Sequence, residues 1–153
     1  MTAPIAGALA ALLFLCNLTA CEASTTPSSG YTCRSTPEAP HVSKGEKAKG
    51  RLVTIAKVRT TCTKLVDSHR VTMLLERKVD GRWVRMASDA DTRVPQPGKE
   101  LTTDVDWSGC ITVRWRLTLG GSPTLGARTG KIPPLTRERT IPRDACDLDS
   151  PAT

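Results

Sequence analysis

The segment from His69 to Ser88 constrains the fold more than any other part of the chain. Its apolar residues alternate with polar ones, which is the pattern of a strand with one buried face. The dipeptide Asp80-Gly81 follows, and it is favoured in two-residue type I′ hairpins. We therefore expect an antiparallel hairpin with its return strand at Arg82 to Ser88. The residues that share the buried face of the first strand are Val71, Met73, Leu75 and Val79.

A two-residue turn also fixes the register of this hairpin. It places Trp83 on the face opposite the aliphatic residues, where the ring either anchors a partner or glycan or packs beneath a neighbouring loop. The expected cross-strand pairs are Val79 with Arg82, Lys78 with Trp83, Arg77 with Val84, Glu76 with Arg85 and Leu75 with Met86.

Four further segments have strand character, and none has a helical period of useful length. Asp89–Glu100 and Gly120–Pro134 are rich in turn residues and are expected to be loops. Several short strands between turn signals predict an all-β fold, a single small immunoglobulin-like antiparallel β-sandwich with two disulfides. The further strands are expected at Arg51 to Cys62, Leu101 to Trp107, Ile111 to Leu119 and Arg137 to Ile141.

The two strands on either side of Cys110 leave two arrangements open. A three-residue turn at 108–110 would pair Trp107 with Ile111 and keep the apolar residues on one face. In a Greek-key sandwich the two strands would instead belong to different sheets. In both arrangements Arg114 and Arg116 point outward.

The N-terminal segment determines how the cysteines are interpreted. Ile5 to Leu15 has the length of the apolar region of a signal peptide and is too short for a transmembrane helix. The sequence Leu18-Thr19-Ala20-Cys21 that follows resembles the lipobox of bacterial lipoproteins. This resemblance implies cleavage before Cys21 and a diacylglycerol thioether on that cysteine, which would anchor the protein in the membrane. The alternatives are cleavage after Ala20 or Ala23 with free secretion, or an uncleaved apolar tail.

The expected domain organisation follows from this segment. Residues 1–20 would be a signal peptide and 21–32 a flexible tether rich in Ser, Thr and Pro. Residues 33–147 would form the sandwich, and 148–153 a disordered tail. The protein is therefore expected to be exported, and either anchored on the extracytoplasmic face of the membrane or secreted.

Four cysteines remain for the exported domain, and structural disulfides are the default in an oxidising compartment. We favour bridges Cys62–Cys110 and Cys33–Cys146, the first joining two sheets through the core. The alternative pairing, Cys33–Cys62 with Cys110–Cys146, closes shorter loops.

Several short segments together resemble small exported proteins of high-GC Gram-positive bacteria. This resemblance implies an exported compartment and the sandwich fold, and it implies no activity. The segments are Cys33, Pro40-His41-Val42-Ser43, Arg59-Thr60-Thr61-Cys62, Leu74-Leu75-Glu76-Arg77, and Cys110 followed by Trp115-Arg116.

Composition and motifs argue against most chemistries. The formal charge of +7 lies wholly outside the first 20 residues, and few aromatic residues accompany the scattered basic ones, so a nucleic-acid surface is not expected. His41 and His69 have no nucleophile motif beside them. Asp89, Asp91, Asp104 and Asp106 lack the alternating ligand pattern of a calcium loop. We expect no enzyme activity, no cofactor and no metal.

The expected function is therefore a non-catalytic binding or structural role in the cell envelope. Besides the membrane, partners would be a protein or an anionic envelope polymer. A freely secreted effector or enzyme inhibitor, acting through exposed loops, is the alternative. The residues expected to form a partner surface are Trp83, Arg85, Arg114 and Arg116.

Overall fold

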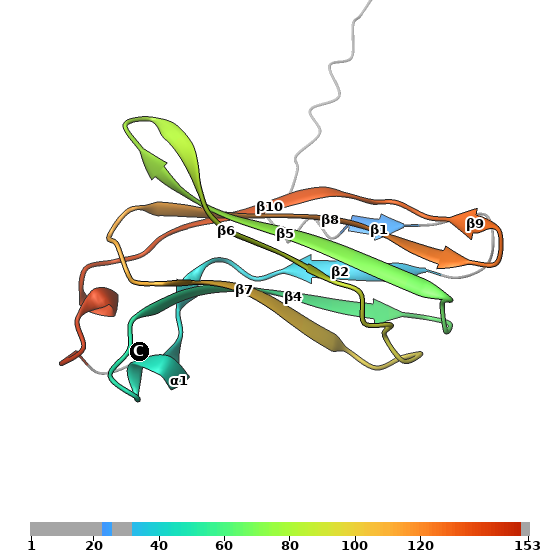
Figure 1. Cartoon of the computed structure of the whole chain (residues 1–153), viewed down its shortest axis with the longest axis horizontal. Helices are drawn as coiled ribbons and strands as arrows, with labels where there is room; N and C mark the ends of the chain where they lie inside the picture. The colour runs from blue at the N-terminus through green and yellow to red at the C-terminus, as the bar shows by residue number, and fades with distance from the viewer. Residues whose placement is uncertain (1–22, 26–31, 151–153) are drawn as a thin grey trace, which may run out of the picture.

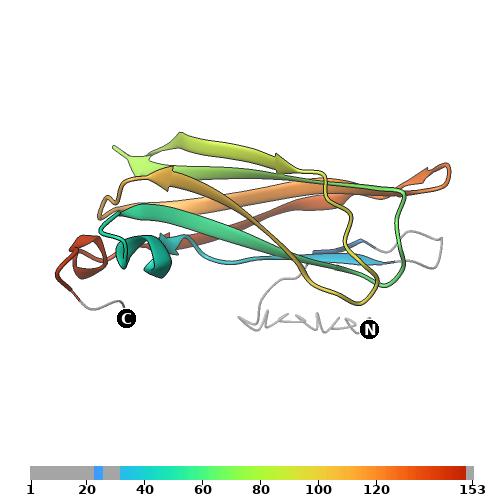
Figure 2. The same cartoon turned by 60° about the horizontal axis from the view of Figure 1, so that its bottom comes forward.

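The computed structural model describes residues 23–25 and 32–150, and it shows two antiparallel sheets packed face to face (Figures 1 and 2). The expected sandwich is therefore present. The expected signal peptide, residues 1–20, and Cys21 lie outside the described residues. Within the expected tether, Ala23–Thr25 forms a short strand that pairs with Cys33 to Ser35.

Sheet 1 is built around one long strand, β4, which has partners on both sides. β2 and β3 pair with different parts of one edge of β4, and β7 pairs with the other edge. β1 extends the sheet beyond β2. The strands of sheet 1 are β1 (Ala23–Thr25), β2 (Cys33–Pro37), β3 (His41–Val42), β4 (Val53–Cys62) and β7 (Leu101–Ser108).

Sheet 2 has the order β10-β8-β5-β6, so that β5 and β8 are its central strands. A short strand, β9, also pairs with the end of β8. β8 and β10 together occupy most of the region from Gly120 to Pro134, which was wrongly predicted to be a loop. The strands of sheet 2 are β5 (Ser68–Val79), β6 (Arg82–Asp91), β8 (Arg114–Leu125), β9 (Arg128–Thr129) and β10 (Ile132–Thr140).

The core lies between the sheets, and alternation along each strand supplies it. Trp115 is fully buried, and its indole Nε1 donates to the Ile111 carbonyl at 3.0 Å. Trp107 from sheet 1 lies against it, with ring centroids 5.6 Å apart. The other buried residues of this cluster are Ala56, Val58, Val71, Met73, Leu75, Val105, Leu117, Leu119, Ile132 and Ile141.

The β5–β6 hairpin follows the predicted register near its turn and departs from it farther away. Asp80 and Gly81 both have positive φ, 47° and 79°, as a type I′ turn requires. The four predicted pairs nearest the turn are present. Leu75, however, lies opposite Ala87, because a β-bulge near Met86 adds one residue to β6. The expected Leu75–Met86 pair was therefore wrong, and the strand continues to Asp91, beyond Ser88.

The strands on either side of Cys110 belong to different sheets, which is the second of the two arrangements considered. β7 pairs with β4 in sheet 1, whereas β8 pairs with β5 in sheet 2. Gly109 begins the crossing with φ 134°. A Cβ at Gly109 would lie 2.6 Å from the Trp107 ring, so this position requires glycine.

The disulfides are Cys33–Cys62 and Cys110–Cys146, so the pairing that we favoured was wrong and the alternative is present. Cys33 lies directly opposite Cys62 at one end of β4. Cys110 follows the strand that pairs with Val53, at the other end of β4. Ten strand residues separate these ends by roughly 30 Å, too far for a bridge between Cys62 and Cys110.

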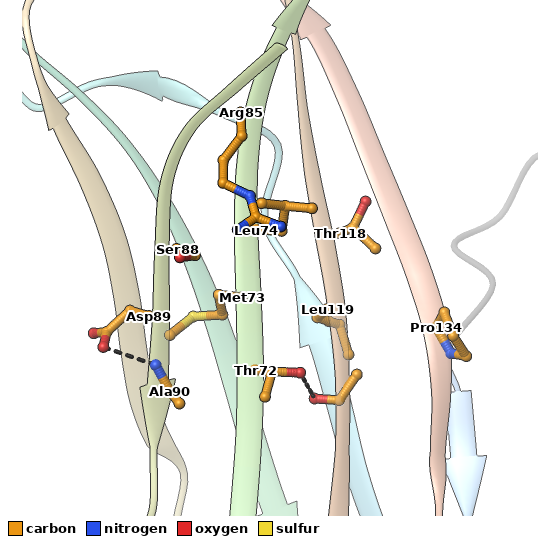
Figure 3. A pocket seen from close by; sticks show the side chains of 11 residues that line it. Thr72, Met73, Leu74, Arg85, Ser88, Asp89, Ala90, Thr118, Leu119 and Pro134 are labelled. Carbon is orange, nitrogen blue, oxygen red and sulfur yellow. Dashed lines mark hydrogen bonds between the residues drawn. The ribbon is translucent and has the colours of Figure 1, made fainter. Parts of the chain in front are cut away.

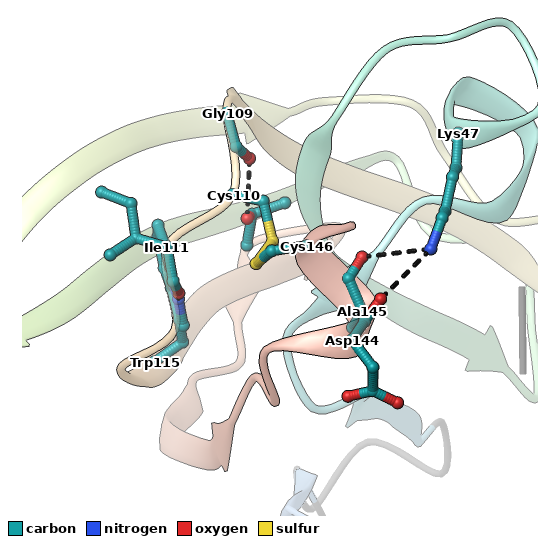
Figure 4. The surroundings of a disulfide bond; sticks show 9 residues. Lys47, Gly109, Cys110, Ile111, Trp115, Asp144, Ala145 and Cys146 are labelled. Atoms are coloured by element: carbon teal, nitrogen blue, oxygen red, sulfur yellow. Dashed lines mark hydrogen bonds between the residues drawn. A yellow bond between two sulfur atoms is a disulfide. The ribbon is translucent and has the colours of Figure 1, made fainter. Parts of the chain in front are cut away.

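Two short helices flank the second disulfide (Figure 4). They are α1 (Lys44–Lys47) and a 3₁₀ helix, η1 (Asp144–Cys146). The largely buried Lys47 ammonium lies 3.4 Å from the carbonyl oxygens of Asp144 and Ala145, and it donates to both. The C-terminal segment is thus held by one covalent bridge and by one charged side chain.

Candidate binding surface on the outer face of sheet 2

A row of four charged residues crosses the outer face of sheet 2. Strand pairing places Glu138, Arg116, Glu76 and Arg85 side by side, one on each of β10, β8, β5 and β6. Arg116 donates to the Glu76 carboxylate through Nε at 2.8 Å and through a terminal nitrogen at 2.7 Å. The Glu76 side chain is only 10% exposed, so this ion pair is well shielded from water.

Trp83 stands next to this row on the same face, as the hairpin register predicted. The Arg116 guanidinium carbon lies 4.3 Å from the ring centroid, and the Lys78 ammonium lies 5.8 Å from it. Both distances are in the range of cation–π contacts. The ring is half-buried, so Arg116 holds it in place while part of it remains accessible.

The four residues expected to form a partner surface are therefore brought to one solvent-facing side. Arg114 begins β8 on that side and donates to Glu138 at 2.8 Å. Four cations face two carboxylates there. No described residue forms an ion pair with Arg85, although Glu76 is its cross-strand neighbour. The cations are Lys78, Arg85, Arg114 and Arg116, and the carboxylates are Glu76 and Glu138.

A shallow hollow of about 580 Å³ adjoins the charged row, and the sequence analysis missed it (Figure 3). Two rows of mostly short side chains form it. Thr72 lies between Gly120 and Ala90, and Leu74 lies between Thr118 and Ser88. The short outward residues were visible in the sequence. Their meeting was not, because it depends on pairing between β5 and β8, which are distant in the chain.

A second hollow, of about 450 Å³, lies on the outer face of sheet 1. Asp104 and Asp106 of β7 line it together with Glu46. Lys49 and Arg51 both donate to the Glu46 carboxylate, and these bonds lower the pKa of Glu46. Its carboxylate is therefore already neutralised by cations of the same chain.

The two histidines lie in structural environments. His69 is 2% exposed, and its Nδ1 lies 3.2 Å from the Arg93 carbonyl oxygen, while its buried Nε2 has no hydrogen-bond partner in the described part of the chain. Burial lowers the pKa of His69, and the Arg93 carbonyl and the Asp91 charge only partly oppose that effect. His41 Nδ1 lies 3.1 Å from the Ala39 carbonyl oxygen.

The four aspartates considered for calcium do not converge. Asp104 and Asp106 belong to sheet 1, whereas Asp89 and Asp91 belong to β6 of sheet 2. Hydrogen bonds from Arg93 lower the pKa of Asp91, and the same contact raises the pKa of Arg93. Across residues 23–25 and 32–150, no group of three or more His, Cys, Asp or Glu side chains is arranged to hold a metal ion.

The wider context of the surface comes from the disulfides. Two bridges in one small domain are typical of an extracytoplasmic protein. Among the described residues, no helix has the length and apolar character needed to cross a membrane. Comparisons with protein family models, with curated proteins and with solved structures gave no match to this chain.

Proposed function

We propose that this protein is a cell-envelope lipoprotein, tethered through Cys21, whose sandwich binds an anionic envelope polymer without catalysis. The outer face of sheet 2 is the proposed binding surface. One observation carries this proposal. Trp83, Arg85, Arg114 and Arg116 gather on one accessible face in which cations outnumber carboxylates.

The strand order supports an immunoglobulin-like assignment. Three principal strands, β2, β4 and β7, face the four-stranded order β10-β8-β5-β6. Sandwiches with such sheets serve widely as recognition modules. Catalysis plays no part in the proposal, because the surface offers cations and an aromatic ring rather than a nucleophile paired with a base.

Electrostatics and stacking would act together on this face. Excess positive charge raises the local concentration of an anionic polymer, and this attraction weakens as salt is added. Trp83 adds a contact that does not depend on charge, since the apolar faces of sugar rings pack on aromatic rings. Because Arg116 already holds the indole ring, little entropy would be lost when the polymer binds.

Binding to purified Gram-positive cell walls, before and after removal of their anionic polymers, tests the proposed surface. We expect the double variant Arg85→Gln/Arg114→Gln to bind intact walls about tenfold more weakly, at the scale of charged hydrogen bonds. The control is Lys64→Gln/Arg143→Gln, which removes the same charge from exposed positions elsewhere. Equal losses in both variants would show that net charge alone attracts the wall, which contradicts a defined surface.

Membrane fractionation tests the tether separately. We expect the wild-type protein in the membrane fraction, with a mass increased by that of the lipid. The variant Cys21→Ser should be absent from the membrane fraction and should have the unmodified mass. Release of the wild-type protein into the medium at unmodified mass would contradict anchoring and favour the freely secreted effector.

A further inference from the structure

We propose that the hollow beside the charged row binds one acidic sugar unit, with its carboxylate on Arg85. This inference rests on the proposed function, and it names the chemical class that the outer face of sheet 2 recognises. The hollow is formed by the outward side chains of β5, β6 and β8, next to the row that contains Arg85.

The sequence of the three strands creates the hollow. Successive outward rows lie roughly 7 Å apart, since each strand residue rises about 3.4 Å and alternate residues face outward. Two adjacent rows carry mostly short side chains or none, and the next row carries Arg116, Glu76 and Arg85. Long side chains beside short ones leave a recess of about 580 Å³, within the usual range for ligand pockets.

Arg85, which has no ion-pair partner among residues 23–25 and 32–150, supplies a cation at one end of this recess. Figure 3 shows its side chain extending from β6 toward Leu74, and Arg85 lines the hollow. Glu76 would be its natural partner, but two Arg116 nitrogens already bind Oε2 of that carboxylate. A guanidinium left in this state can form a two-point contact with a carboxylate from a ligand.

The remaining lining suits a sugar ring better than an acyl chain. The hydroxyl groups of Thr72, Ser88 and Thr118 can bond to sugar hydroxyls, and Leu74 and Pro134 can contact the C–H face. The Asp89 carboxylate also lines the hollow, and its Oδ1 accepts from the Ala90 N–H at 2.7 Å, so the ligand carboxylate is placed on Arg85, away from Asp89. Thr72 Oγ1 donates to the Gly120 carbonyl at 3.2 Å, so its oxygen remains able to accept. An acyl chain would cover the hydroxyl groups of Ser88 and Thr118 without offering them a hydrogen-bond partner.

An extended peptide is disfavoured by where the hollow lies. Peptides that add to a sheet need an edge with unpaired backbone groups. Beneath the hollow, β5 and β8 each pair on both sides, so their backbone groups are used within the sheet. β6 forms the edge of the sheet beside the hollow, and there the Ala90 N–H already donates to Asp89 Oδ1 at 2.7 Å. Side chains therefore carry most of the recognition.

Titration of the ¹⁵N-labelled protein with a tetrasaccharide of uronic acid tests this inference, with a neutral tetrasaccharide and tetra-aspartate as comparison probes. We expect shifts at Thr72, Thr118 and Ala90 with the uronic acid probe alone. Arg85→Gln should weaken this binding at least tenfold. Arg82→Gln removes the same charge from the same strand outside the hollow, and it should leave the affinity within about twofold.

Ala90→Leu provides a second variant, because it fills the exposed recess without changing charge or the core. It should also weaken binding about tenfold, which attraction by net charge alone would not explain. The inference would be overturned if Arg85→Gln and Arg82→Gln lost equal affinity for the uronic acid probe, or if tetra-aspartate caused equal chemical-shift changes. If intact walls bind and the uronic acid probe does not, the sugar site is refuted while the proposed function stands. If the protein binds neither intact walls nor the uronic acid probe, the sugar site and the proposed function are both refuted.

Discussion

Removal of the Cys33–Cys62 bridge should destabilise the sandwich strongly. The bridge joins residues 29 positions apart, and both cysteines are fully buried. A cross-link over a loop of that length reduces the entropy of the unfolded chain by about 12 cal/mol/K, which corresponds to about 3.6 kcal/mol at 25 °C. The double variant Cys33→Ala/Cys62→Ala would therefore lose a large share of the 5–15 kcal/mol typical of a domain.

The second bridge provides the matched comparison. Cys110 and Cys146 are 36 positions apart, and the same relation gives about 3.8 kcal/mol. Chain entropy alone thus predicts nearly equal losses. The native contexts differ, because Cys33 and Cys62 pack with buried Val66, whereas Cys110 and Cys146 are partly exposed. Loss of the second bridge would therefore loosen the C-terminal end rather than the core. We expect Cys110→Ala/Cys146→Ala to be the milder of the two.

Urea unfolding, followed by the fluorescence of the packed pair Trp107 and Trp115, measures both losses of stability. The variant without Cys33–Cys62 should also show a larger m-value, since its unfolded chain is more expanded, and a melting temperature lower by roughly 10–20 °C. A loss below about 1 kcal/mol with an unchanged m-value would refute the entropic reasoning. A Cys62–Cys110 peptide in a non-reducing digest would refute the pairing itself.

Two further outcomes follow from the buried ionisable groups. The pKa of His69 is lower in the folded protein than its ordinary value of 6.5, so the unfolded chain binds more protons below that pH. The free energy of unfolding should therefore fall as the pH drops through 6.5, and it should level off below the folded pKa. Urea titrations at several pH values should show this slope, and the variant His69→Gln should lack it. Glu76→Gln should lower the free energy of unfolding by about 2 kcal/mol, because it breaks the shielded ion pair with Arg116. Arg114→Gln breaks the more exposed ion pair with Glu138, and it should lower the free energy of unfolding by less than about 0.5 kcal/mol. Similar costs in these two variants would contradict the shielding argument.

Local patterns predicted individual strands well. The buried residues of β4 share one parity, as the alternation indicated, and so do those of β5 apart from Glu76. The turn at Asp80-Gly81 and its four nearest pairs were also predictable, because a two-residue loop leaves only one register. The bulge near Met86 was not predictable, since no turn or alternation signal in the sequence marks the extra residue.

The candidate surface was predictable only in part. Trp83 and Arg85 could be placed on one face from the hairpin alone, and Arg114 and Arg116 from the parity of their own strand. The contact of Arg116 with Trp83 joins β8 to β6 across β5, and no local pattern encodes that neighbour relation. The hollow beside them depends on the same long-range pairing.

The sequence by itself determined the strand character of the chain, the hairpin turn and a set of cysteines suited to an oxidising compartment. These properties depend on residues close together in the chain, through side-chain alternation and turn geometry. Only the tertiary structure decided which sheet each strand joined, which cysteines met and where the charged row and the hollow formed. Those outcomes depend on strand pairings between distant segments, because each pairing must bury its apolar face against the other sheet at the same time.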